Sequence, residues 1–554
     1  MATSFQFNGK TVTLPGSYGN IKSGIKNPSP ALPYGNVLII DTGSGAGFGG
    51  GSGVSGTLAQ GTKAIYEFDN IQDFQNFQKG GLWWLLANPL YNPNGNGYNG
   101  VSKIFWMKAA VTTPAAWNLT FFGDGHQSLS QQHSSANGGN LRISVTDEGT
   151  VGNGVINTAG NLINGYAVKM LPGVVNTNAF TLNFYQGTYK GLDQNGLPYD
   201  GVYSNYTQPK LIAQSPEFTN ISTLITWMNT NATFLKYFKL TASTVTGTGA
   251  IDKYDYADFK YFVPATGGTE NYGVDTTYLN LCLAAAADML VNFVLADQWG
   301  TNAVSTYNQA LASYVVNGNK YQPELYVAGG DDVNTFITTP GSLADAVSFN
   351  QDSVTLVHGA SQIQSKLGMR TYSAIYTAAN WLGREAGLPP QVPLTFKNIK
   401  IDGLTHLLNT QEQLKCLSAG VLATILDAGN FECLKGVNTL QNNAFLINDD
   451  GTIPSKQLKR ICRQVNNTLL VNSKKLLKDP NGVNRNTLST TDIQVWVAGQ
   501  LKNMIALPGQ DNLILSFDDN IVVVREQDAY RISYRFTPNS EISILLFTGT
   551  VLNV

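Results

Sequence analysis

The sequence carries little charge. Only 13% of its 554 residues are Asp, Glu, Lys or Arg, which is about half of the usual share. The surface is therefore built largely from uncharged polar residues, which suits a protein covered by neighbours, because few charges must lose their water on assembly. Many secreted proteins share this composition. The net charge of −2 gives no general attraction to nucleic acid or to an anionic membrane.

Cysteine is also scarce. The four cysteines form no C-x-x-C pair and have no histidine at metal-ligand spacing, so we expect free thiols in a reducing compartment. No basic segment followed by an apolar stretch opens the chain, which argues against a secretory signal. The most apolar helix candidate, Leu279 to Leu295, is too short and too polar to span a membrane. We expect a soluble protein made in a cytoplasm.

The known catalytic signatures are missing. The sequence contains no G-x-S-x-G, no H-E-x-x-H, no P-loop and no EF-hand loop. His126 and His133 lie in a polar loop without the spacing of zinc ligands, and His358 and His406 are expected to be hydrogen-bonding residues. The acidic doublets flank turns, which explains them more simply than a catalytic pair. We therefore expect no enzyme, with no catalytic, cofactor-binding or metal-binding residues and no cofactor.

One glycine-rich stretch needs a separate decision. Residues 43–53, GSGAGFGGGSG, follow a predicted buried strand at 37–40 and contain G-x-G-x-x-G at Gly45, Gly47 and Gly50. This fingerprint binds a dinucleotide when a helix begins at the third glycine, but the residues that follow here have strand character. We predict a surface loop. A nucleotide-cofactor-dependent α/β enzyme remains the alternative, and it requires a helix directly after Gly50.

Strand and helix patterns alternate through most of the chain. They predict one α/β domain from residues 31–110 and 256–360, interrupted by an all-β insertion at 111–255. A C-terminal α/β domain follows at 361–540. The fold class is therefore α/β with several domains. Helices are predicted at residues 69–86, 279–295, 371–386, 411–419 and 456–478.

Both ends of the chain have the alternation of edge strands. In the first 14 residues, apolar side chains alternate on both sides of Asn8-Gly9. This pattern predicts either a small hairpin or one extended arm at 1–30. At the other end, residues 541–554 read EISILLFTGTVLNV. A terminal strand must complete a sheet of its own chain or pair with the edge of a neighbour, and the residues alone favour neither.

The order of these features resembles the contractile tail sheath proteins of phages and related injection machines. Near the N-terminus, Pro15-Gly16-Ser17-Tyr18, VLIID, a glycine-rich turn, KAIYEFDNIQDFQNF and KIFWMKA follow in the order of that family. In the last third, AIYTAANWLGREAGLPPQVPLTFKNIKIDGL, TQEQLKCLSAGVLATI and LKRICRQVNNTLL are similar to its elements. The resemblance covers 30–110 and 360–554, whereas 111–255 resembles the variable decoration that the family inserts. The glycine tract is longer than usual for the family.

The resemblance implies a mechanical role. Subunits of the family polymerise helically around an inner tail tube, with baseplate and tail terminator proteins as further partners. Contraction then drives the tube through the host cell envelope for genome delivery. Such a subunit is assembled in the host cytoplasm, belongs to the virion tail, and neither binds nucleic acid directly nor inserts into a membrane. A non-contractile shell or adhesin-like structural protein is a further alternative.

The resemblance also assigns roles to residues. The N-terminal arm that pairs with a neighbouring subunit would contain Phe5, Phe7, Val12 and Leu14. The C-terminal arm would contain Ile542, Ile544, Leu546 and Val551. The sheet that accepts both arms would contain Ile521, Val523, Ile532 and Tyr534. The basic helix at 456–478 is the candidate contact with an acidic tail tube, through Lys456, Arg460, Arg463, Lys474 and Lys475.

Overall fold

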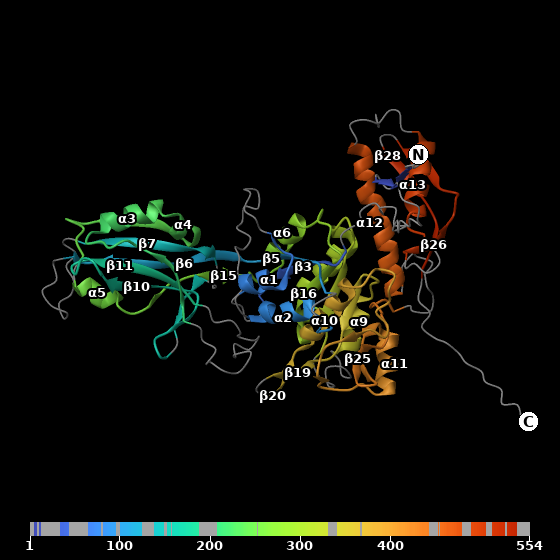
Figure 1. The fold of residues 1–554 in the computed structure, drawn as a ribbon. Coiled ribbons are helices and arrows are strands. Elements are labelled where there is room, and N and C mark those ends of the chain that lie inside the picture. The colour runs from blue at the N-terminus through green and yellow to red at the C-terminus, as the bar shows by residue number, and fades with distance from the viewer. Residues whose placement is uncertain are drawn as a thin grey trace, which may run out of the picture. The chain divides into compact units, whose positions relative to one another are not determined.

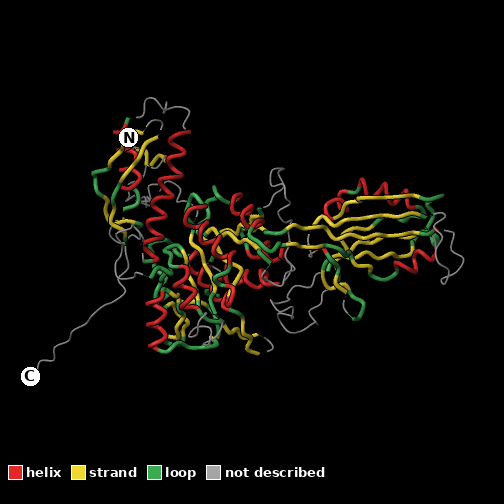
Figure 2. The backbone as a smooth tube through the Cα atoms, turned by 180° about the vertical axis from the view of Figure 1, so that it is seen from behind, coloured by secondary structure: helices red, strands yellow, loops and turns green. Residues whose placement is uncertain are grey.

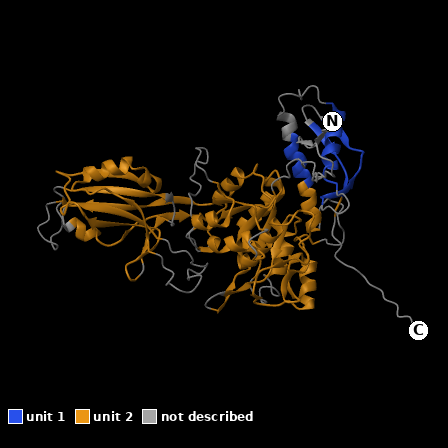
Figure 3. Cartoon of the chain, in the orientation of Figure 1, with its two compact units in different colours: residues 1–33, 465–537 blue, residues 34–464, 538–554 orange. Residues whose placement is uncertain are grey.

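The computed structural model describes residues 5–7, 10–12, 34–43, 65–78, 81–95, 100–123, 138–148, 152–156, 158–187, 208–251, 253–330, 341–365, 368–441, 453, 455–478, 489–505, 512–526 and 529–539. The chain divides into two compact units (Figure 3). One unit comprises residues 1–33 and 465–537, and the larger one comprises residues 34–464 and 538–554. Most of the predicted glycine loop, together with Leu14 and the predicted C-terminal arm, lies outside the described residues.

The larger unit is built on a seven-stranded sheet (Figure 1). All neighbours in it are parallel except β4, which pairs antiparallel with β5. Its strands, in spatial order, are β23 (Val421–Leu422), β18 (Val354–Val357), β17 (Glu324–Ala328), β16 (Phe293–Trp299), β3 (Asn36–Asp41), β5 (Lys103–Lys108) and β4 (Tyr66–Phe68). The unbroken apolar run of β3 is buried throughout, as expected for a parallel strand with helices on both faces.

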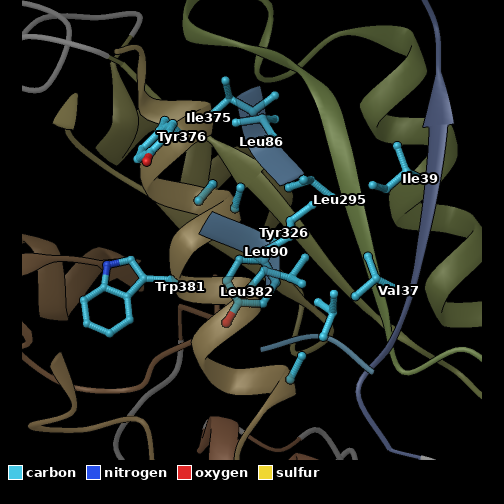
Figure 4. Packing of buried hydrophobic residues seen from close by; sticks show 14 of the residues in the cluster. Val37, Ile39, Leu86, Leu90, Leu295, Tyr326, Ile375, Tyr376, Trp381 and Leu382 are labelled. Carbon is cyan, nitrogen blue, oxygen red and sulfur yellow. The ribbon is translucent and has the colours of Figure 1, made fainter. Parts of the chain in front are cut away.

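Each face of this sheet has its own hydrophobic core. Val37 and Ile39 point to one core and Leu38 and Ile40 to the other, because successive side chains of a strand alternate between the faces. The first core is covered by α1 (Ile71–Gln78), α2 (Gly81–Tyr91) and α10 (Ala374–Ala386), and Figure 4 shows its packing. The second is covered by α6 (Thr277–Ala285), α7 (Thr306–Ser313), α9 (Ser342–Phe349) and α11 (Thr410–Ala419).

A β-rich region follows β5 and precedes α6. One of its two four-stranded antiparallel sheets contains β13 (Phe238–Val245), β7 (Gly139–Glu148), β6 (Val111–Phe121) and β15 (Thr269–Asn271). The other contains β12 (Lys210–Gln214), β11 (Phe180–Gln186), β10 (Tyr166–Pro172) and β14 (Val263–Pro264). A third hydrophobic core is formed by residues of both sheets, and β8 (Val155–Ile156) pairs with β9 (Leu162–Asn164) beside them. Figure 2 shows helices at the outer faces of this region.

The expectation that residues 111–255 are all β is wrong. They contain α3 (Ile221–Thr230) and α4 (Ala232–Tyr237), and α5 (Lys253–Phe259) begins at their end. The side chains of Asn220 and Asn231 cap α3 and α4 by accepting backbone N–H groups of the first turn. The region also extends beyond residue 255, because β14 and β15 belong to its sheets.

Two further boundaries differ from the prediction. The helix expected at 279–295 ends at Ala285, and Phe293 begins the buried strand β16. A short apolar run does not reveal by periodicity whether it is a helix or a central strand. The domain boundary expected at residue 360 falls within one core, because β23 continues the central sheet and α10 packs against it.

The remaining elements are small except for one long helix, α12 (Lys456–Lys478), which has residues in both units. The larger unit also holds two three-stranded sheets, one of β20 (Gly368–Tyr372), β19 (Ser361–Ser365) and β22 (Gly403–Leu404), the other of β21 (Asn398–Ile399), β25 (Asn430–Cys433) and β24 (Thr424–Asp427). The smaller unit contains α13 (Thr490–Lys502) and the strands β1 (Phe5–Phe7), β2 (Lys10–Val12), β26 (Ile514–Phe517), β27 (Val522–Glu526), β28 (Ala529–Ser533) and most of β29 (Phe536–Pro538). β1 and β2 pair antiparallel, with Phe5 opposite Val12, so the hairpin alternative holds for these residues.

The close approach of α10 to α2 generates a prediction. A Cβ atom on Gly383 of α10 would lie 2.4 Å from the carbonyl oxygen of Pro89 and 2.6 Å from that of Leu90 in α2. We expect Gly383→Ala to lower the free energy of unfolding by about 1–3 kcal/mol, because the two helices must separate. Gly499 in α13 has no atom within 4 Å of such a Cβ, so Gly499→Ala should be neutral or stabilising by up to about 1 kcal/mol. Urea unfolding of both variants tests this, and equal midpoints would contradict it.

Candidate functional site

The basic stripe of α12 faces the interior of the chain. Lys456, Arg460 and Arg463 have relative exposures of 2%, 2% and 8%. The expectation that these three residues contact a tail tube is therefore wrong, because their charged ends are enclosed by the larger unit. For Lys474 and Lys475 the structure describes the helical backbone but not the side chains, so their role as a tube contact stays a prediction.

Lys456 lies between two buried carboxylates. Its Nζ is 2.9 Å from Oε2 of Glu385 in α10 and also contacts Oε1 of Glu324 at the start of β17. The same Nζ donates a hydrogen bond of 2.7 Å to Oγ1 of Thr355 in β18. Burial, followed by the charges of the neighbouring arginines, lowers the pKa of Lys456, and burial raises the pKa of Glu385. Only close pairing of opposite charges makes such a site tolerable.

Arg460 binds the segment that follows α10. Its Nη atoms donate hydrogen bonds to the carbonyl oxygens of Leu388 and Val392 at 3.1 Å and of Pro389 at 3.3 Å. Its Nε lies 3.3 Å from Glu385 Oε1 and donates to the Tyr34 hydroxyl at 2.9 Å. These hydrogen bonds hold α12 against the segment 388–392 that follows α10.

Arg463 completes what we call the α12 ion network. Its Nη1 lies 3.5 Å from Oε2 of Glu324, whereas its Nε and Nη2 have no hydrogen-bond partner in the described structure. The network thus comprises Glu324, Glu385, Lys456, Arg460 and Arg463. It joins the first turns of α12 to β17, β18 and α10.

A second polar cluster lies at the carboxyl ends of neighbouring parallel strands. Asp41 ends β3, Lys108 ends β5, and Asp297 lies in the second half of β16. This edge of an α/β sheet is where such folds place ligands. Here Glu270 and Tyr272, in and just after β15, occupy it instead. Lys108 and Glu270 form a buried ion pair of 2.7 Å that ties the β-rich region to the central sheet.

The hydrogen bonds of Tyr272 require a protonated carboxyl. Its hydroxyl lies 2.9 Å from Asp41 Oδ2 and 2.9 Å from Glu270 Oε2, but it has one proton to donate. One of the two carboxyl groups must therefore donate to the phenol oxygen. Burial raises the pKa of Asp41, which favours Asp41 as the protonated group.

Asp297 is held beside this cluster. Its two carboxylate oxygens accept hydrogen bonds from the backbone N–H and the hydroxyl of Thr42 at 2.5 and 2.6 Å. Burial, with a smaller contribution from Asp41, raises the pKa of Asp297 to about 7. The cluster therefore gains or loses protons near neutral pH.

Neither cluster has the geometry of a metal or catalytic centre. Among the described residues, no three His, Cys, Asp or Glu side chains are grouped as ligands of a metal ion. His358 Nδ1 lies 2.9 Å from Ser342 Oγ, but both residues are buried and the Gly330 N–H already donates to that oxygen. His406 Nε2 lies 2.9 Å from Glu412 Oε2. Both histidines are thus hydrogen-bonding residues, as predicted.

The predicted acceptor residues lie in or directly beside the two-stranded ribbon of β27 and β28. β27 pairs with β28, with Val523 opposite Ile532, and β26 pairs with β29. Ile521 and Val523 are buried, whereas Ile532 and Tyr534 are half-buried. On the alternate positions of β27, Val522 and Val524 are exposed. Within the part of the chain that the structure describes, each ribbon has two strands.

Comparison with solved structures identifies the fold. The chain aligns with a sheath tail protein from Listeria innocua at a TM-score of 0.56 and 13% identity, over 93% of this chain and 94% of that one. A sheath tail protein from Desulfitobacterium hafniense aligns at a TM-score of 0.55 and 13% identity, over 95% and 98%. The chain has the tail sheath fold. No family model matches its sequence, and no curated protein does.

The sequence pattern did not single out two members of the α12 ion network, Glu324 and Glu385. Glu385 lies in the helix 374–386, beside Leu382 and Ala386 of its predicted apolar face, and it is fully buried. Glu324 opens an apolar strand and is 1% exposed. A charged residue inside an apolar segment is rarely buried without a partner, so these two glutamates were the available signal that a basic stripe pairs with them.

The α12 ion network predicts a large effect of removing one charge. Glu385→Gln leaves Lys456, Arg460 and Arg463 facing Glu324 alone, and it should cost about 3–5 kcal/mol of unfolding free energy. Adding Lys456→Met should restore part of this loss, because it removes one of the unpaired cations. Asp427→Asn, at an exposed position, should stay within about 0.5 kcal/mol of wild type. Urea midpoints measure all three, and a wild-type midpoint for Glu385→Gln would contradict the network.

The carboxylate cluster predicts a pH dependence. The pKa of folded Asp297, about 7, exceeds its ordinary value of 3.8, so the folded state binds the proton more tightly than the unfolded state. Stability should therefore fall as the pH rises from about 4 to about 7, by about 1.4 kcal/mol for each unit of pKa difference. Asp297→Asn should flatten this fall, whereas the exposed Asp288→Asn should not. Unfolding free energies measured across this range decide, and parallel curves for Asp297→Asn and wild type would refute the assignment.

Proposed function

We propose that the chain is the structural subunit of a contractile tail sheath. The observation that carries the proposal is the alignment of almost the whole chain with two sheath tail proteins. In this proposal the subunits polymerise helically around an inner tail tube, with baseplate and terminator proteins at the ends. Contraction drives the tube through a host envelope, and the subunit needs no catalytic residue.

Strand exchange links the subunits in this proposal. The N-terminal arm with Phe5, Phe7, Val12 and Leu14 and the C-terminal arm with Ile542, Ile544, Leu546 and Val551 pair with neighbouring chains. The acceptor in this proposal is the ribbon of β27 and β28, with Ile521, Val523, Ile532 and Tyr534. The exposed side chains of Val522 and Val524 on β27 and of Leu515 on β26 support this assignment. Exposed apolar strands are sites where another chain can pair.

Contraction needs bodies that stay rigid while their contacts change. The α12 ion network supports such a body, because buried charges hold α12 to the sheet only in one arrangement. In this proposal only the C-terminal end of α12 contacts the tail tube. There Lys474 and Lys475 meet an acidic tube surface. The described residues include no helix that could cross a membrane. The proposed location is a phage tail or a related injection machine.

Negative-stain microscopy of the purified chain tests this function. The full chain should form hollow striated tubes, and a variant lacking residues 1–20 and 541–554 should remain monomeric, because it has lost both arms. Circular dichroism should show that the shortened chain is folded. Compact monomers from both chains, at concentrations up to the solubility limit, would refute strand-linked assembly.

A further inference from the structure

The α12 ion network contains the two reactants of an amide bond. Nζ of Lys456 contacts Oε1 of Glu324, and both side chains are buried. An ammonium and a carboxylate together hold the atoms of one amide and one water molecule, so their condensation needs no oxidant and no further reactant. Because folding has already brought the two groups into contact, the reaction does not pay the entropy of bringing two free molecules together.

Burial shifts this equilibrium towards the amide. In water the separate ions are favoured, because both are hydrated. In the interior that hydration has been lost on folding, and condensation turns two buried charges into one neutral group. One positive and one negative charge disappear together, so the net charge of the α12 ion network stays the same. The amide oxygen remains an acceptor for Arg463.

A hydroxyl group joins the two reactants. Thr355 Oγ1 accepts a hydrogen bond of 2.7 Å from Lys456 Nζ and donates one of 2.6 Å to Glu324 Oε1. Protons can therefore pass from the nitrogen through this hydroxyl to the oxygen that must leave. Thr355 lies in β18, next to β17, and is fully buried. Bulk water is thus kept from competing for these hydrogen bonds.

Glu385 is placed to free the electron pair of the nitrogen. Its Oε2 lies 2.9 Å from Lys456 Nζ and also contacts the hydroxyl of Tyr326. Burial lowers the pKa of Lys456 and raises the pKa of Glu385. Both shifts favour the transfer of one ammonium proton to Glu385, and the neutral amine that remains is a nucleophile.

We propose that Lys456 and Glu324 condense into an intramolecular amide bond in the folded chain. The electron pair of Nζ attacks Cδ of Glu324, a C–N bond forms, and the bond from Cδ to Oε1 breaks. Of the three ammonium protons, one stays on the amide nitrogen. The other two, including the one held by Glu385, leave with Oε1 as water. Arg463 Nη1, 3.5 Å from Oε2, stabilises the negative charge that develops on that oxygen.

This reaction occurs once in each chain and acts on no substrate, so it differs from enzymatic turnover. It joins the start of α12 to the start of β17, 132 residues earlier in the sequence. Because α12 continues into the smaller unit, the amide fixes to the central sheet the helix that the two units share. The bond forms within one chain and therefore does not depend on the proposed sheath function.

The mass of the purified full-length chain, measured after denaturation, tests the bond. Wild type should be lighter than its sequence by the mass of one water molecule. Lys456→Arg should have its full sequence mass, because a guanidinium stays protonated and does not attack a carboxyl group. Lys459→Arg is the matched control: Lys459 lies on the same helix in a partly exposed pair with Asp352, so this variant should still lose the water. Wild type at its full sequence mass would overturn the proposal and leave Lys456 and Glu324 as an ion pair.

Tryptic peptides locate the bond. Trypsin does not cleave after an acylated lysine, so peptide 321–366 should be joined to peptide 436–459. Fragment ions should place the junction between Glu324 and Lys456. A loss of water that persists in Lys456→Arg, or a junction at other residues, would refute the assignment.

The rate of condensation tests the role of Thr355. In chains made by cell-free synthesis, the condensed fraction should grow at least tenfold more slowly for Thr355→Val than for wild type. Thr355→Ser keeps the hydroxyl and should retain the wild-type rate. Circular dichroism should show that both variants are folded. Equal rates for Thr355→Val and wild type would contradict the proposed proton path.

Discussion

The pairing of Glu324 and Glu385 with the cations of α12 is the constraint on which the larger unit depends. Charges this deeply buried lose several kcal/mol of hydration each, and only partners at close range compensate. The first turns of α12 can therefore lie only where both glutamates are within reach of Lys456. Arg460 adds a second condition, because it must also meet the carbonyl groups of Leu388 and Pro389, just after α10. Removing one member costs much stability, because it leaves an uncompensated charge in the interior.

The sequence predicted the helices and strands more accurately than the residues that pack around them. β3, α10, α11 and α12 follow from apolar runs or helical periodicity, because their local patterns are long and consistent. The orientation of α12 did not follow. The spacing of Lys456, Arg460 and Arg463 shows that they share one face, but a polar face can be turned to water or to buried carboxylates. Glu324 and Glu385 contact Lys456 in the fold, but they lie 132 and 71 residues before it in the sequence. Local patterns cannot reveal such pairings.

The low content of charged residues has a further consequence in the folded chain. Part of the small stock of charged residues is buried in the α12 ion network and in the pair of Lys108 with Glu270. The surface is therefore poorer in charge than the composition indicates. Val522 and Val524 on β27, and Val174 and Val175 after β10, add exposed apolar positions to this surface. Few charges need to be desolvated when such surfaces meet, so the same composition that weakens electrostatic steering favours dense packing between chains.

Buried charge also limits which parts of the chain can move against one another. The α12 ion network fixes α12 to the central sheet, and Lys108, Glu270, Tyr272 and Asp41 fix the β-rich region to the ends of its strands. Neither junction can slide by a small amount, because a displaced partner leaves an unpaired charge in a dry site. Packed interiors of this kind are bistable and do not deform continuously. In the sheath proposed above, the change between two packings would therefore fall on the contacts between chains.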